Sequence, residues 1–225
     1  MGLFEMIFGK KKPRFSERIW LTTQGKMNDL LGHLQSNARQ GFNSVVVTHF
    51  QDTHQSLLEI LAKDGFNSQV INSVSQFPHG MPDVFKQKGQ LLVLMSEAIP
   101  SFVARAIPSQ PKNATLLPVS VNMIEHYPLL ERDQRVLDLD KVWPMRLEFK
   151  SYTSFDEPWL SAFGVDRVRT IISKLGMNKE EVLEHPMLIQ SIQSAQKRLA
   201  RQVPREQICA SCQEWVHKNL DRKTR

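Results

Sequence analysis

The stretch from Asp156 to Leu199 reads DEPWLSAFGVDRVRTIISKLGMNKEEVLEHPMLIQSIQSAQKRL and carries the strongest local signals in the chain. Asp166 is suited to cap a helix that Gly176 is suited to end. The apolar residues between them follow helical spacing: Val168, Ile171, Ile172 and Leu175. His185-Pro186 predicts the start of another helix that continues toward Pro204, because proline is tolerated in the first turn. Short helices joined by tight turns are therefore expected here.

The same stretch resembles the SecA preprotein translocase motor. In that family an acidic residue before a short apolar helix, then F-x-x-D-R-V, K-L-G-M, E-H-P and A-Q-(K/R)-(K/R), join the second motor domain to the long scaffold helix. Residues 20–72 resemble the start of that second domain with lower specificity, through Val45–Thr48, the helix around Gln55–Leu58 and the run from Gly65 to Asn72. The resemblance covers most of residues 20–200 and implies a degenerate, stand-alone copy of the second RecA-like domain plus the start of the scaffold.

Apolar runs alternate with helical or turn-rich segments, which predicts an α/β fold. The predicted class is a three-layer RecA-like (P-loop NTPase-like) domain with a mostly parallel sheet and a C-terminal helical extension. The strongest helix is expected from Lys26 to Arg39, with Gly41 just past its end. Strands are expected at Val45–Thr48, Val70–Ile71, Leu91–Met95, Leu116–Val121 and Arg146–Ser151.

The chain divides into four parts: a basic amphipathic tail (1–18), a degenerate RecA-like domain (19–153), a helical SecA-like segment (154–204) and a basic C-terminal helix or tail (205–225). Its 225 residues carry a net charge of +6, with 41% hydrophobic and 23% charged residues, which is typical of an ordinary soluble protein. Residues 1–26 contribute +4, residues 197–225 contribute +5 and the body −3. Because the positive charge lies at the ends, a nucleic-acid groove on the fold itself is disfavoured.

No independent ATP site is expected, and neither a catalytic residue nor a cofactor is predicted. The sequence G-x-x-x-x-G-K-(S/T) is missing, since Gly9-Lys10 is followed by Lys11. The SecA loop T-N-M-A-G-R-G-T-D corresponds to residues 95–101, which lack its glycines and its arginine. Arg132 and Arg135 remain as candidate ATP-edge arginines, although a solvated helix of ion pairs explains them better.

The retained SecA-like segment suggests a docking surface for SecA, its channel or a preprotein. The residues that the resemblance offers for such contacts are Asp166, Arg167, His185, Gln196 and Lys197. The alternative is structural: helix caps and turns account for Asp166, Arg167, Gly176, His185 and Pro186.

The N-terminal tail places a short apolar run beside a basic cluster, which favours weak attachment to an anionic membrane. The candidate membrane residues are Leu3, Phe4, Ile7, Phe8, Lys10, Lys11 and Lys12. The tail could equally pack on the body. No apolar run can span a bilayer, and the basic cluster follows the apolar residues, unlike a secretory signal. The expected location is the cytoplasm, with possible contact to the inner face of the membrane.

Cys209, Cys212 and His217 form a C-x-x-C-x-x-x-x-H pattern that is one ligand short of a closed zinc site. The alternative is packing on a helix from Arg205 to Leu220 with an apolar stripe of Ile208, Cys212, Trp215, Val216 and Leu220. Five other histidines lie apart on different elements and are expected to be structural or exposed: His33, His49, His54, His79 and His126.

Three functions fit these signals. The first is a non-catalytic SecA-like module, accessory or regulatory, in Sec-dependent preprotein export. The second is a split subunit that completes an ATP site on a partner chain. The third is a basic-tailed RecA-like domain that binds nucleic acid, which is the least favoured because the body of the chain is acidic.

Overall fold

The computed structural model describes residues 16–78, 80–100, 113, 116–161, 181–184 and 186–220. Seven strands among these residues form one sheet in the order β3-β4-β2-β5-β6-β1-β7. Neighbouring strands run parallel, except that β7 is antiparallel to β1. The strands are β1 (Ser16–Trp20), β2 (Ser44–Thr48), β3 (Ser68–Ile71), β4 (Leu91–Met95), β5 (Val119–Met123), β6 (Leu147–Ser154) and β7 (Val182–Leu183).

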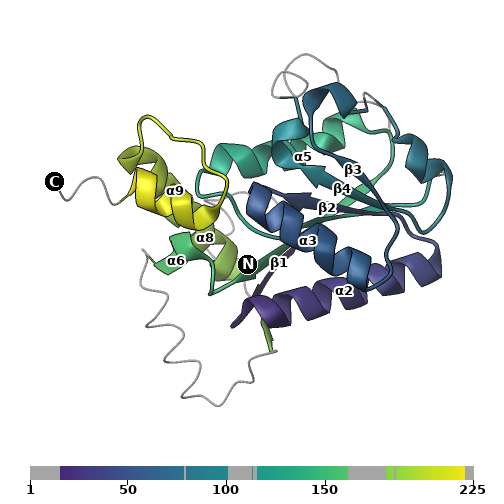
Figure 1. The fold of residues 1–225 in the computed structure, drawn as a ribbon, viewed down its shortest axis with the longest axis horizontal. Coiled ribbons are helices and arrows are strands. Elements are labelled where there is room, and N and C mark those ends of the chain that lie inside the picture. Colours follow the sequence, from purple (N-terminus) through teal and green to yellow (C-terminus); the bar gives the residue numbers. More distant parts are fainter. Residues whose placement is uncertain are drawn as a thin grey trace, which may run out of the picture.

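Helices cover both faces of this sheet (Figure 1). α2 (Thr23–Gln40) and α3 (Gln51–Lys63) pack on one face, and α5 (Leu130–Val142) packs on the other. The alternation of side chains along β2 explains the two cores, because Val46 faces α2 and α3 whereas Val45 and Val47 face the α5 side. The predicted three-layer α/β class with a mostly parallel sheet is confirmed.

α2 shows how local sequence sets an element. Thr22 caps it, with Oγ1 accepting from the backbone N–H of Gly25 at 3.1 Å, and Gly41 ends it in the left-handed conformation with φ 78°. Leu30 and Leu34 lie on its buried face. The helix predicted from Lys26 to Arg39 is confirmed, with a few further residues at its N-terminal end.

The C-terminal part supplies α6 (Pro158–Ser161), α8 (Pro186–Gln202) and α9 (Cys212–Asn219). The helix predicted to begin at His185-Pro186 is confirmed by α8. The helix predicted from Arg205 to Leu220 is wrong in its first half, because Ser211 caps α9 and the preceding residues are not helical. As a result Ile208 does not join an apolar stripe and is 65% exposed.

The five predicted strands are present: Leu91–Met95 has the predicted ends, and the other four have shifted ends. The fourth begins at Val119 and not at Leu116, since Pro118 has no N–H to offer the ladder. β1 and β7 were not predicted. Short 3₁₀ helices at Val74–Gln76, Asp83–Lys86 and Ser96–Ala98 follow β3 and β4. No helix in the described part of the chain has the length and apolar character needed to cross a lipid bilayer.

Candidate functional site at the carboxyl edge of the sheet

The connections of the sheet diverge between two neighbouring strands, β2 and β5. The chain leaves β2 for α3 on one face and leaves β5 for α5 on the other. In open α/β sheets, ligands bind in the crevice outside the carboxyl ends of the strands at such a switch point. Residues 49–54 and 124–133 surround this crevice, which is therefore the candidate functional site.

Glu125, two residues past β5, occupies the N-terminal end of α3. Its Oε1 accepts from the backbone N–H groups of His49 at 2.9 Å and Phe50 at 3.0 Å, and its Oε2 accepts from the Thr53 hydroxyl at 2.8 Å. Phe50 is the N-cap and has no side chain able to cap. The buried Glu125 carboxylate therefore satisfies these two backbone donors. Backbone N–H groups at a helix N-terminus are also the donors that commonly bind phosphate groups.

A second buried network centres on His126. Its Nδ1 lies 2.6 Å from Asp133 Oδ2, and its Nε2 lies 2.8 Å from Glu17 Oε2. Burial alone would lower the pKa of His126, but the two carboxylates outweigh it and raise that pKa well above 6.5. His126 is therefore an imidazolium that joins β1, the β5–α5 loop and α5.

Asp133 gathers donors from four places. Besides the contact with His126, the Asp133 carboxylate lies 3.0 Å from His49 Nε2. It also accepts hydrogen bonds from the backbone N–H of Tyr127 at 2.9 Å and from the side-chain amide of Gln196 at 2.6 Å. Burial would raise the pKa of Asp133, but the charge of His126 and these hydrogen bonds hold it well below its usual range. Because Gln196 lies on α8, this carboxylate ties the C-terminal extension to the sheet.

Another charged pair lies nearby. Lys26 Nζ donates to the backbone oxygen of Ile124 at 2.7 Å and lies 3.2 Å from Glu157 Oε1. Both side chains are buried, and burial raises the pKa of Glu157 above its usual value. The pair joins α2, the end of β5 and the start of α6.

The C-terminal segment closes the crevice from outside. Glu206 accepts hydrogen bonds from the Tyr127 hydroxyl and from Trp215 Nε1, the latter at 2.7 Å. Trp215 is fully buried beside Tyr127 and Phe50. The loop before α9 lies beside the start of α3 (Figure 1), where the Asp52 N–H donates to the Ala210 oxygen at 3.1 Å. The crevice is thus filled by the chain's own side chains.

A cavity of about 610 Å³ lies beside these contacts of the C-terminal segment, and we name it the carboxyl-edge cavity. It lies between the first turns of α3, the ends of β3 and β4 and the loop before α9. Its walls are His49, Gln51, His54, Gln55, Leu58, Asn72, Met95, Glu97, Ile208, Cys209 and Ala210.

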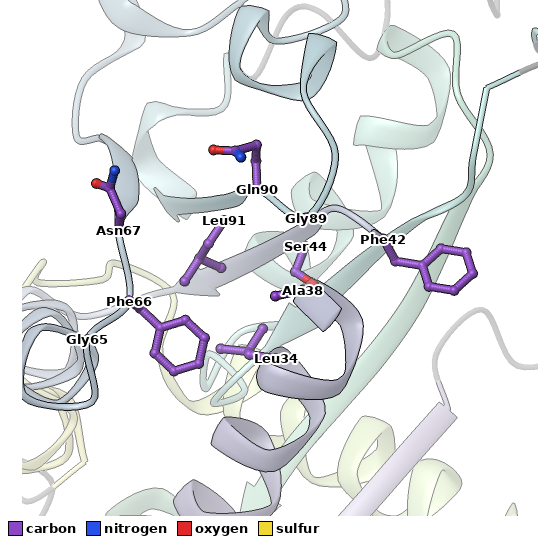
Figure 2. Close-up of a pocket in the computed structure, with 10 residues that line it drawn as sticks. All are labelled: Leu34, Ala38, Phe42, Ser44, Gly65, Phe66, Asn67, Gly89, Gln90 and Leu91. Carbon is purple, nitrogen blue, oxygen red and sulfur yellow. The ribbon is translucent and has the colours of Figure 1, made fainter. Parts of the chain in front are cut away.

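Another cavity, of about 250 Å³, lies at the opposite, amino edge of the sheet (Figure 2). The side chains of Leu34 and Phe66 point toward each other there, whereas the ring of Phe42 points away. Gly89 has φ 69°, and a Cβ on it would lie 2.8 Å from the Ala38 backbone oxygen. The cavity at the amino edge therefore lies where the backbone at Gly89 closely approaches the end of α2 at Ala38, far from the switch point.

Arg132, one of the two predicted ATP-edge arginines, forms ion pairs as the alternative expected, although its side chain is only 14% exposed. Arg132 lies over the Tyr127 ring, 5.3 Å from its centroid, and 3.8 Å from carboxylates of Glu97 and Glu206. Arg135 is partly buried, and burial followed by the nearby charge of Arg132 lowers its pKa. Arg132 is thus already engaged by two carboxylates and a ring.

Among the residues offered for partner contacts, Lys197 is exposed on α8. Gln196 has no exposed surface, because its amide donates to Asp133 and to the Tyr127 oxygen, so it belongs to the interior. Asp166, Arg167 and His185 lie outside the described residues, as do the tail residues Leu3, Phe4, Ile7, Phe8, Lys10, Lys11 and Lys12.

The described residues contain no group of three or more His, Cys, Asp or Glu side chains arranged to hold a metal. Cys209 and Cys212 are both reduced and partly buried, and burial raises the pKa of each thiol. Cys212 packs against the apolar cluster that contains Trp215, which agrees with the packing alternative. His217 lies in the last turn of α9.

The sequence predicts that the five histidines other than His185 and His217 lie apart from one another. For His49 and His126 this prediction is wrong. His49 and His126 meet on Asp133 because β2 and β5 are neighbours in the sheet. His54 and His33 are buried or partly buried at other places, and His79 lies outside the described residues. The sequence signal was position along the chain. His49 directly follows the predicted strand Val45–Thr48, and His126 lies five residues after the predicted strand Leu116–Val121, so parallel strands bring both to the same edge.

Comparison with known proteins gives a local similarity. No protein-family model matches the chain. A stretch of 48 residues is 42% identical to protein translocase subunit SecA of Acidithiobacillus ferrooxidans (strain ATCC 53993 / BNL-5-31), and an equally long stretch is 42% identical to SecA of Thermus thermophilus. Over 51 residues the chain is 41% identical to SecA of Chlorobium phaeobacteroides.

These matches cover 21–23% of this chain and 5% of each SecA, so the chain spans about a twentieth of the length of the relatives it matches. The similarity to SecA is therefore real but local. Among solved structures, the C-terminal part of the Fun30 ATPase domain aligns with a TM-score of 0.40 and 11% identity, covering 78% of this chain and 54% of that chain.

Proposed function

We propose that this chain is a non-catalytic SecA-like module that binds a component of Sec-dependent preprotein export and acts as an accessory or regulatory protein. The local identity of 42% with SecA supports the link to export. The filled crevice at the switch point supports a binding role over nucleotide turnover. In this proposal the four parts 1–18, 19–153, 154–204 and 205–225 are a tail, the degenerate domain, the docking segment and a basic end.

The carboxylate of Glu125 is the observation that carries the proposal. It accepts from the backbone N–H groups of His49 and Phe50 where α3 begins, next to the switch point. A phosphate brought to these donors would have to displace a buried carboxylate and would face its negative charge. The Glu125 carboxylate at the start of α3 therefore disfavours binding of nucleotide phosphates there.

The two alternatives have less support. A split subunit would need Arg132 to reach a nucleotide on another chain, and its contacts with Glu97, Glu206 and the Tyr127 ring would have to break first. A nucleic-acid-binding domain would need a basic face on the body, whose charge between residues 27 and 196 is −3.

Affinity purification of the tagged chain from its own host tests the proposal. We expect SecA, the Sec channel or preproteins to be enriched above an untagged background. Lys197→Glu reverses an exposed charge on α8 and should reduce that enrichment. Lys63→Glu makes the same change on α3 at the opposite edge of the sheet and should not. Recovery of no Sec component, or equal loss in both variants, would refute the proposal.

Contact of the tail with membranes is a separate part of the proposal. Its apolar and basic residues suit the surface of an anionic bilayer. Flotation with liposomes that contain anionic lipid should recover the full chain and recover less of a variant that lacks residues 2–14. Equal recovery of both would remove the membrane from the account.

A further inference from the structure

The outward side of α8 carries positive charge and no negative charge. The helix reads PMLIQSIQSAQKRLARQ and contains neither Asp nor Glu. Where the burial of its side chains is described, one side of the helix lies in the interior through Ile192, Ala195, Gln196 and Leu199. Four exposed residues follow one another at steps of four, three and four on the opposite side, and we name them the α8 ridge: Gln190, Ser194, Lys197 and Arg201. Because an α-helix has about 3.6 residues per turn, these steps place the four side chains in one line that points away from the core.

The two cations of the ridge lack the partners that a solvated helix commonly supplies. On α9, opposite charges stand one turn apart, and Lys218 Nζ lies 2.5 Å from Glu214 Oε1. On α8, the same spacing joins two like charges, Lys197 and Arg201, and neither pairs with a carboxylate of the described residues. The helix dipole favours Arg201 in the last turn, but it does not account for Lys197 one turn earlier. Since like charges at this spacing destabilise a helix slightly, the ridge is matched to a negative charge outside the helix.

The surroundings of the ridge separate narrow from broad polyanions. A bilayer or a nucleic-acid duplex extends past one helix. The neighbouring α5, which Gln196 joins to α8 through Asp133, exposes Glu131 and Asp140, and these carboxylates repel a broad negative surface. The exposed side chains of α8 that the structure describes include no aromatic ring to stack on bases and no large aliphatic group to enter a bilayer. A single acidic helix meets the ridge alone.

We propose that the α8 ridge binds an acidic α-helix of the partner protein, with carboxylates at the same steps of four, three and four residues. Two of these carboxylates face Lys197 and Arg201, and the planar guanidinium suits a carboxylate held by two parallel hydrogen bonds. Gln190 and Ser194 donate to the others. The ridge is about 16 Å long, which corresponds to roughly three helical turns. The inference rests on the proposed function and adds the chemistry of the partner at the docking segment.

Fluorescence anisotropy with the full chain tests this surface. The ridge probe is fluorescein-labelled Glu-Ala-Ala-Ala-Glu-Ala-Ala-Glu-Ala-Ala-Ala-Glu, whose glutamates share one side of a helix. The comparison peptide, Ala-Glu-Ala-Glu-Ala-Ala-Ala-Ala-Glu-Ala-Glu-Ala, has the same composition but divides its glutamates between two opposite sides. We expect saturable binding of the ridge probe that weakens as salt is added, and an affinity on the order of tenfold lower for the comparison peptide.

Paired double variants separate the ridge from the net charge of the chain. Lys197→Glu with Arg201→Glu reverses both cations of the ridge. Lys63→Glu with Lys88→Glu changes the net charge by the same amount at two exposed positions near the amino edge of the sheet. We expect the ridge variant to bind the ridge probe about tenfold more weakly and the control variant to stay within about twofold of the parent. An equal loss in the two variants would overturn the proposal, as would equal affinity for the two peptides.

Vesicles that contain anionic lipid and an RNA duplex serve as the broad polyanions. If either one binds to the parent and not to the ridge variant, while the ridge probe does not bind, the ridge belongs to that polyanion and the proposal is wrong. No Sec component is present in these assays. Failure of the ridge probe therefore rejects the acidic helix, whereas the affinity purification decides the proposed function independently.

Discussion

Replacing Asp133 by asparagine should destabilise the fold more than any other single isosteric change at the switch point. The carboxylate is 2% exposed and accepts from His126, His49, the Tyr127 N–H and Gln196. Asparagine keeps the shape but removes the charge that faces the His126 imidazolium, and its amide N–H₂ turns a donor toward donors. Breaking a buried charge pair by removing one partner costs about 3–5 kcal/mol.

That loss is a large share of a domain's stability of about 5–15 kcal/mol. For a chain of this size it corresponds to a fall in Tm on the order of 10 °C. Urea unfolding followed by tryptophan fluorescence and by circular dichroism measures the free energy of unfolding. Asp140→Asn makes the same change at an exposed position of α5 and should stay within about 0.5 kcal/mol of the parent. A loss below about 1 kcal/mol for Asp133→Asn would refute the network's importance.

Three further predictions follow from individual residues. Because the pKa of His126 is raised, the contribution of His126 to the free energy of unfolding is complete below pH 6.5. It is lost as the pH rises above 6.5, by about 1.4 kcal/mol per pH unit. In His126→Gln, the free energy of unfolding should not show this decrease with pH. In urea unfolding, Gly89→Ala should lower the free energy of unfolding more than Gly65→Ala does. Both glycines have positive φ, but only at Gly89 would the added Cβ meet backbone, 2.8 Å from the Ala38 oxygen. An equal loss of stability in the two variants would contradict this. Burial and Lys150 lower the pKa of His33 to about 4, so His33→Gln should flatten the loss of stability as the pH falls from 6.5 to 4; an unchanged acid limb would argue against it.

The central strands could be predicted because their residues are buried on both faces. Val45–Val47 and Leu91–Leu94 are continuous apolar runs of the kind that a covered parallel sheet requires. β1 could not be predicted in this way, since its sequence SERIW places Glu17 and Arg18 in the strand. Glu17 is buried only because His126 and Thr153, distant in sequence, supply its partners.

The start of α9 was missed although the sequence held a signal for it. Ser211 and Glu214 have the spacing of a capping box, and Ser211 Oγ does accept from the Glu214 N–H at 3.1 Å. The switch-point network had no comparable local signal. Gln196 lies 63 residues from Asp133, and Glu17 lies 109 residues from His126, so the folded sheet alone brings them together.

Titration of Mg-ATP into the purified chain by isothermal calorimetry tests the central claim most directly. The claim is that the chain's own carboxylates and C-terminal helices fill the crevice where a fold of this kind binds anionic ligands. We therefore predict no saturable heat of binding at millimolar nucleotide, a level at which a dissociation constant of about 1 mM would be detected. A one-to-one isotherm tighter than that, weakened by a change at Arg132, would contradict the account.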